Sequence, residues 1–170
     1  RRPTYNAAWF NGLKTVTFTA SSHTILSTAV DTVALGAVAT ASGFIVGQML
    51  TGTESYGRAI SYLGNGVAND YDNNASADWL TRDNVSNGIA SFRAGVAQET
   101  QAISLATNYR LGVIWDGTNV TAYVNNSAGT PDAFSASFTS PGRISIGGDN
   151  TFTQADIADA WAGAISEVVI

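Results

Sequence analysis

A hairpin near the middle of the chain constrains the fold more than any other stretch of the sequence. Between Asn108 and Asn126, every second residue of two short runs is apolar: Leu111, Val113 and Trp115, then Val120, Ala122 and Val124. Successive side chains of a strand point to opposite faces, so this period of two predicts two half-buried β-strands. Gly117 lies between the runs and can take the positive φ of a tight turn. We therefore expect an antiparallel hairpin within a larger sheet.

Further short apolar runs, separated by turn residues, follow one another along the chain. We expect strands at residues 15–19, 32–39, 43–50, 56–63, 77–81, 89–96, 101–105, 133–138, 143–146 and 161–170. Many short strands at intervals of ~8–12 residues are typical of a sandwich or a barrel. A chain of 170 residues can bury a core of its own. We therefore expect an all-β fold in which residues 1–170 form a single domain.

The charge and residue content exclude several kinds of partner and site. The net charge is −5, and the few cations form no basic stripe, so we expect no nucleic-acid partner. The sequence has no apolar run long enough for a spanning helix, so we expect no membrane insertion. It has no cysteine, which excludes disulfides and thiolate metal sites.

Three patterns in the second half of the chain follow one another in a characteristic order. They are Trp115-Asp116-Gly117 with the strand after it, Ile144-Ser145-Ile146-Gly147-Gly148, and Trp161-Ala162-Gly163-Ala164-Ile165-Ser166-Glu167-Val168-Val169. In this order and spacing they resemble the C-terminal half of laminin-G-like, concanavalin A-like jelly-roll domains. The opening Arg-Pro-Thr-Tyr, followed by Asn11-Gly12 and Val16-Thr17-Phe18, resembles the start of such domains in bacteriophage tail and other virion proteins.

This resemblance implies a concanavalin A-like jelly-roll sandwich of two antiparallel sheets. Trp115 and Trp161 are large apolar groups that suit the space between two such sheets. A fold of this kind carries many functions, so the function has to be argued from particular residues.

The carboxylates do not have the pattern that glycoside hydrolysis requires. Enzymes of this fold that act on glycosides place two or three carboxylates on one strand, because hydrolysis needs an acid and a base or nucleophile at a defined separation. None of the three glutamates, Glu54, Glu99 and Glu167, has a carboxylate two residues away. His23 is the only histidine, and no nucleophile-elbow pattern is present. We therefore expect no catalytic residues and no enzyme.

Two polar segments contain the oxygen ligands that Ca²⁺ prefers. Asp70 and Asp72 belong to the most polar run of the chain, and Asp149 and Asn150 follow a pair of glycines. Neither segment has a fixed ligand spacing, and the alternative interpretation is that these are solvated turn residues. We expect no obligatory cofactor, with calcium at these residues as the one metal left open.

Aromatic side chains beside polar groups are candidates for binding a glycan. The candidates are Tyr56, Tyr71 and Trp79, with Arg82 as a polar neighbour of Trp79. The alternative for Trp79 is an ordinary place in the core. Trp9, beside Phe10, is either core or part of a surface that contacts a neighbouring chain.

The function we expect is that of a non-enzymatic structural or binding module. The resemblance implies a bacteriophage virion protein of the tail, the fibre or the capsid decoration, located on the virion or outside the cell. Its partners would be other virion proteins, further copies of itself or a cell-surface glycan. The alternatives are a secreted bacterial carbohydrate-binding module and, less favoured by the carboxylate pattern, a polysaccharide-active enzyme.

Overall fold

The computed structural model describes residues 2–10, 12–28, 40–51, 57–64, 77–82, 88–93, 96–133, 142–148 and 160–170. Besides one short 3₁₀ helix, η1 (Ala20–Ser22), the described elements are strands. Their bounds are β1 (Thr4–Phe10), β2 (Leu13–Phe18), β3 (Leu26–Ser27), β4 (Thr40–Met49), β5 (Arg58–Gly64), β6 (Ala77–Arg82), β7 (Gly88–Arg93), β8 (Val96–Ala102), β9 (Tyr109–Asp116), β10 (Asn119–Val124), β11 (Ser127–Ala128), β12 (Asp132–Ala133), β13 (Gly142–Ile146) and β14 (Gly163–Val169). In the described ranges no helix is long and apolar enough to cross a membrane.

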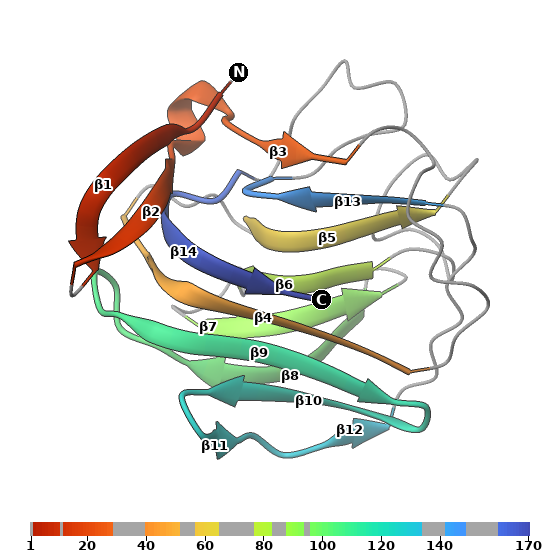
Figure 1. Ribbon diagram of the computed structural model, residues 1–170. Coiled ribbons are helices and arrows are strands. Elements are labelled where there is room, and N and C mark those ends of the chain that lie inside the picture. The colour runs from red at the N-terminus through yellow and green to blue at the C-terminus, as the bar shows by residue number, and fades with distance from the viewer. Residues whose placement is uncertain are drawn as a thin grey trace.

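The strands form two antiparallel sheets that face each other (Figure 1), which confirms the expected all-β sandwich. The eight-stranded sheet has the order β1-β2-β14-β4-β9-β10-β11, with β12 also paired to β10. The six-stranded sheet has the order β3-β13-β5-β6-β7-β8. Several neighbouring strands, such as β2 and β14 or β4 and β9, are far apart in the sequence. The register between such strands determines which side chains meet.

The predicted central hairpin is confirmed as β9 and β10. Trp115 pairs with Val120 and Leu111 with Val124, with Gly117 at φ 100° in the turn between them. The three predicted inward residues of β9, Leu111, Val113 and Trp115, are all almost fully buried. On the other side of β9 lies β4, whose Ile45 is paired with Leu111. The hairpin therefore lies inside the eight-stranded sheet, as the sequence predicted.

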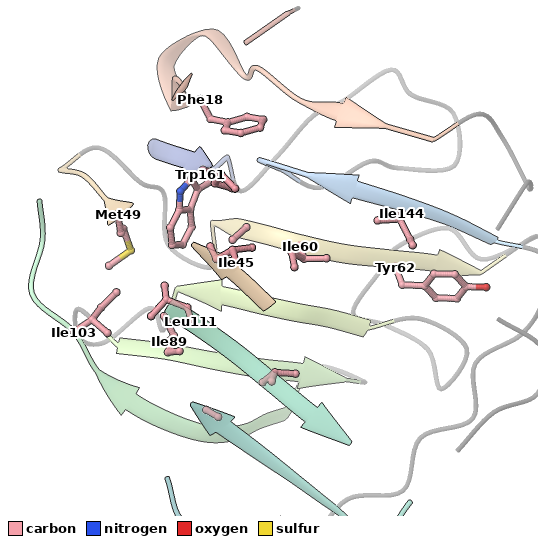
Figure 2. Packing of buried hydrophobic residues seen from close by; sticks show 14 of the residues in the cluster. Phe18, Ile45, Met49, Ile60, Tyr62, Ile89, Ile103, Leu111, Ile144 and Trp161 are labelled. Carbon is pink, nitrogen blue, oxygen red and sulfur yellow. The ribbon is translucent and has the colours of Figure 1, made fainter. Parts of the chain in front are cut away.

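The space between the sheets is filled by apolar side chains from both layers (Figure 2). Trp161 lies near Phe18 and Met49 at one end, and Ile60, Tyr62 and Ile144 come from the six-stranded sheet. The interpretation of both tryptophans as core residues is confirmed, since Trp115 is 1% and Trp161 0% exposed. Burial of groups of this size supplies much of the stability of a small sandwich.

The last strand, β14, lies between β2 and β4 and joins the two ends of the chain in one sheet. Two glycines allow β14 and β4 to approach closely. A Cβ on Gly163 would collide with the backbone oxygen of Gln48, and one on Gly47 with the backbone oxygen of Ala164. A larger residue at either position would push the strands apart.

Some expected strands differ from those observed. The strand expected at residues 89–96 is divided between β7 and β8, which pair with each other in antiparallel fashion. The chain therefore reverses direction between Arg93 and Val96, which the apolar pattern did not reveal. The strand expected at residues 32–39 and most of that at residues 133–138 lie outside the described residues.

Candidate binding surface

Most of the residues singled out from the sequence lie outside the described ranges. This holds for Tyr56, Asp70, Tyr71, Asp72, Asp149 and Asn150. Trp79 and Arg82 both belong to β6, which lies between β5 and β7 in the six-stranded sheet. No group of three or more metal-binding side chains occurs in the described residues. The predicted glycan and calcium sites therefore stay predictions.

The outer face of the eight-stranded sheet is described across its central strands, and its side chains can be followed by register. Paired residues of neighbouring strands share a face. One row runs from Val169 of β14 through Phe44 of β4 and Gly112 of β9 to Tyr123 of β10. Because the alternate residues of β4 and β9 point into the core, this row points outward. Phe44 and Tyr123 are both partly exposed.

Phe44, Gly112 and Tyr123 form an aromatic platform on this face. A Cβ added to Gly112 would overlap Cδ1 and Cε1 of the Phe44 ring and lie 3.2 Å from its Cγ. The ring of Phe44 therefore lies over Gly112, on the strand that separates it from Tyr123. A glycine inside a strand often marks such a close approach of another group. The result is a low apolar surface bordered by two aromatic residues.

Charged groups border the platform on its next row. Glu167 of β14 and Arg110 of β9 both pair with Val46 of β4, one from each side. Both side chains are exposed, and their strands stand about 10 Å apart because neighbouring strands are ~4.8 Å apart. A carboxylate and a guanidinium therefore stand on either side of the apolar Val46.

Amide and hydroxyl groups continue the face toward the β1 edge. Thr17 of β2 pairs with Ala164 of β14, which pairs with Gln48 of β4. The Nε2 of Gln48 donates a hydrogen bond to Oδ1 of Asn108 at 2.7 Å. Gln48 itself is buried, so the uncharged hydrogen-bonding groups that reach solvent here are those of Asn108 and, in part, Thr17.

A shallow hollow lies where this polar row reaches the edge of the sheet. It has a volume of about 470 Å³ and is lined by Thr4, Asn6, Ala8 and Thr17. Asn6 donates from Nδ2 to Oγ1 of Thr17 at 2.6 Å, which fixes both side chains. The four lining residues are uncharged, and three of them have polar side chains.

Local hydrogen bonds fix the two ends of β9, and so the row of outward residues between them. At the first end, Arg110 N–H donates to Oδ1 of Asn125 at 3.2 Å and Asn125 N–H donates to the oxygen of Arg110 at 2.6 Å. At the other end, Asp116 Oδ1 accepts from the N–H groups of Thr118 and Asn119 at 2.9 and 2.7 Å. These backbone donors lower the pKa of Asp116 from 3.8 to about 2.

Tyr109, at the start of β9, is held in a similar way. Its phenol oxygen accepts the N–H of Ser104 at 3.0 Å. This backbone donor lowers the pKa of the phenol from its ordinary value of 10.0, against a smaller opposing effect of burial. The bond links the start of β9 to the segment that follows β8.

The six-stranded sheet has a different character in its described part. Arg58 of β5 and Arg143 of β13 are each 1% exposed, although arginine is almost never fully buried unless it is paired. Ser61 and Ser145, paired across these two strands, are equally buried. In the described part of the six-stranded sheet, cations and hydroxyls therefore lie inside the protein, whereas Arg110 and Glu167 of the eight-stranded sheet are exposed.

The platform residues were not singled out from the sequence. The pattern that identified the buried residues of β9 and β10 also implies that Gly112 and Tyr123 point outward, and a glycine in the middle of a strand was a further signal. What the sequence did not contain was the register that brings Phe44 to Gly112.

Comparison with known protein families and with curated protein sequences gives no match. Among solved structures, the CBM40 of a Ruminococcus gnavus IT-sialidase, bound to α2,3-sialyllactose, has a TM-score of 0.56 at 12% identity, with 85% of this chain and 86% of that chain covered. A carbohydrate esterase from the Shiga toxin-encoding bacteriophage phi24B has a TM-score of 0.50 at 13% identity, with 99% and 86% covered.

An alginate lyase of polysaccharide lyase family 7 has a TM-score of 0.43 at 13% identity, with 77% of this chain covered. This chain spans 58% of that protein, which is less than two thirds of its length. At such identities the likeness establishes the fold alone. The chain therefore has the fold that its sequence predicted, a concanavalin A-like jelly-roll sandwich.

Proposed function

We propose that this chain is a non-enzymatic glycan-binding module whose binding surface is the outer face of the eight-stranded sheet. The observation that carries the proposal is the aromatic platform, in which the ring of Phe44 lies over Gly112 beside Tyr123. Aromatic surfaces with a few placed polar groups are typical of sites for small organic ligands. A sugar ring has an apolar C–H face that can lie on such a surface and a rim of hydroxyl groups.

The polar side chains around the aromatic platform can form hydrogen bonds with the hydroxyl groups of a sugar ring. Arg110 can donate to ring or hydroxyl oxygens, and Glu167 can accept from hydroxyl groups. Both are exposed and lie one row from Phe44. Asn108, which is exposed and is oriented by its hydrogen bond with the buried Gln48, adds an amide group on the row beyond. A ligand that covers two rows would contact apolar, charged and amide groups together.

The positions of the acids on this face favour binding over hydrolysis. Asp116 and Glu167 are the described acids that point outward from β9 and β14. Glu167 lies in the row of Arg110, which is six residues from Asp116 along β9, or about 20 Å at ~3.4 Å per residue. Glycosidases need two carboxyl groups within about 5–9.5 Å. The proposal is therefore a binding module.

Two of the similar structures support a glycan as the ligand. One is a CBM40 bound to α2,3-sialyllactose, and the other is a carbohydrate esterase from a bacteriophage. We propose further that the chain belongs to a bacteriophage virion protein, located on the virion or outside the cell. The resemblance of its first residues to the start of such domains in virion proteins supports this. A secreted bacterial carbohydrate-binding module is the alternative with the same chemistry.

A glycan array tests the proposal, with Phe44→Ala and Tyr123→Ala as the platform variants. The matched control is Tyr5→Ala, because Tyr5 is 60% exposed but lies on β1 and faces the other way from the outward row. Tyr71→Ala and Trp79→Ala test the site predicted from the sequence. We expect the wild type and Tyr5→Ala to bind the same glycans and both platform variants to lose at least about tenfold in affinity.

Two outcomes would contradict the proposal. If no glycan is bound by the folded wild type, the ligand class is wrong. If binding is lost in Tyr71→Ala or Trp79→Ala but kept in Phe44→Ala, the ligand class is right and the surface is wrong. Hydrolysis of a bound oligosaccharide by the wild type would refute the non-enzymatic part.

A further inference from the structure

The positions of the lysines and arginines bear on which glycans the outer face of the eight-stranded sheet can bind. The sequence has eight such residues, and all but Arg1 belong to the described ranges. Half of them lie in strands of the six-stranded sheet: Arg58, Arg82, Arg93 and Arg143. Most of the positive charge of the chain is therefore in the other sheet.

Among the remaining described cations, Arg110 is the one that points outward from the central strands of the eight-stranded sheet. Arg2 precedes β1, and Lys14 belongs to β2. Lys14 lies two residues before Val16, which packs against the core. Because alternate residues of a strand share a face, Lys14 is on the inner side of β2 and not on the outer face. The outer face thus depends on a single guanidinium for positive charge.

Negative charge outweighs positive charge in the chain as a whole and on this face. The net charge is −5, and both Asp116 and Glu167 point outward from strands of the eight-stranded sheet. The segments outside the described ranges contain eight acids and, as their one cation, Arg1. Wherever those acids lie, they add negative charge. A negatively charged ligand therefore approaches a protein of its own sign.

An anionic group on this face would lose hydration without gaining a partner of its own. Against the ring of Phe44 it would meet an apolar surface, and moving a charge out of water is costly unless the charge is paired. Over Val46 it would be attracted by Arg110 and repelled by Glu167 from the opposite side. In the hollow at the β1 edge, the described lining is uncharged. Sugar hydroxyl groups, in contrast, find donors and acceptors in each of the polar places.

We propose that the ligand of this face is an uncharged sugar, a neutral hexose or N-acetylhexosamine unit, and that glycans with a carboxylate or sulfate on the contacted sugar bind more weakly. This inference rests on the proposed glycan-binding function and names the class of glycan. The similar CBM40 is bound to α2,3-sialyllactose, whose terminal sugar carries a carboxylate. At 12% identity that likeness establishes the fold alone, so the ligand has to be inferred from the charges of this chain.

Matched pairs of glycans test the proposal on the full chain. The two members of each pair differ by one anionic group, as do lactose and α2,3-sialyllactose, or a neutral oligosaccharide and its sulfated form. Among the pairs of which either member binds, we expect the neutral member to bind at least about fivefold more tightly. If no member of any pair binds, the proposed glycan-binding function fails as well. If glycans bind but the anionic members bind equally or more tightly, the function stands and this inference is overturned.

Charge-neutralising variants show whether the preference comes from this face. Two unit charges about 8 Å apart change an equilibrium constant about twofold in bulk water and about thirtyfold at the effective dielectric constant of a protein surface. Glu167→Gln should therefore lower the ratio of neutral to anionic affinity at least about twofold, and Arg110→Gln should raise it. The matched control is Glu99→Gln, which changes the net charge equally but lies on β8 of the other sheet. A ratio that Glu167→Gln changes no more than Glu99→Gln does would overturn the inference.

The salt dependence of the wild type keeps the test independent of whether a variant folds. Raising the ionic strength from about 0.01 to about 1 M shortens the screening length from about 30 to about 3 Å. The affinity for the neutral member should change less than about twofold, because an uncharged sugar forms no ion pair. A loss of about tenfold or more would show that the ligand is held by charge and would overturn the proposal.

Discussion

Gly112→Ala separates the role of the platform from that of the sandwich that carries it. The new Cβ would overlap two carbons of the Phe44 ring, so the ring has to swing off Gly112. Because Phe44 is partly exposed, it can move into solvent. Overpacking typically costs ~1–3 kcal/mol, but the free side chain gives way and replacing a strand glycine returns ~0.5–1 kcal/mol. We expect a net loss of unfolding free energy below about 1 kcal/mol.

Gly163→Ala is the matched comparison, because the atoms that its Cβ would meet belong to the backbone and to a buried side chain and cannot move aside. Its Cβ would collide with the backbone oxygen of Gln48 and lie 2.6 Å from Nε1 of Trp161, whose side chain is fully buried. The full overpacking cost of about 1–3 kcal/mol should remain. For a domain of this size that lowers Tm by about 2–12 °C, against less than about 4 °C for Gly112→Ala.

Thermal unfolding and glycan binding, measured on both variants, check this reasoning. Gly112→Ala should stay close to the wild type in Tm and lose binding as Phe44→Ala does. Gly163→Ala should lose stability and, below its Tm, keep binding. The reasoning is refuted if Gly112→Ala binds as the wild type does, or if it is destabilised as much as Gly163→Ala.

Three further predictions concern individual side chains. The pKa of Asp116 in the folded protein is lowered from 3.8 to about 2. Its contribution to stability is therefore present above pH 3.8 and is lost as the pH falls toward 2. An NMR titration of this carboxyl with a midpoint near 3.8 would contradict the turn geometry. Tyr109 should ionise below the ordinary phenol pKa of 10.0 because Ser104 N–H donates to its oxygen, and ultraviolet titration of the wild type against Tyr109→Phe should reveal one phenol that ionises early. Trp161→Ala should cost about 3–5 kcal/mol in urea unfolding, because the indole is fully buried between the sheets; a loss under 1 kcal/mol would contradict that packing.

The sequence predicted the features that depend on local periodicity. The inward residues of the central hairpin and the burial of Trp115 and Trp161 follow from period-two spacing and side-chain size, and both are confirmed. The closing strand, expected at residues 161–170, is observed at Gly163–Val169.

Features that depend on contacts between distant segments could not be predicted. The platform exists because β4 and β9 are neighbours in a register that brings Phe44 over Gly112, and no local pattern states which strands are neighbours. The burial of Arg58 and Arg143 was missed for a related reason, since arginine alone predicts exposure.

Backbone chemical-shift mapping of the labelled wild type during titration with a glycan that it binds tests the central claim most directly. We predict that the largest shifts fall on Phe44, Gly112 and Tyr123, with smaller ones at Arg110 and Glu167, and none along β6. Shifts that cluster on residues 69–74 or on Trp79, with the outer face of the eight-stranded sheet unaffected, would contradict the account.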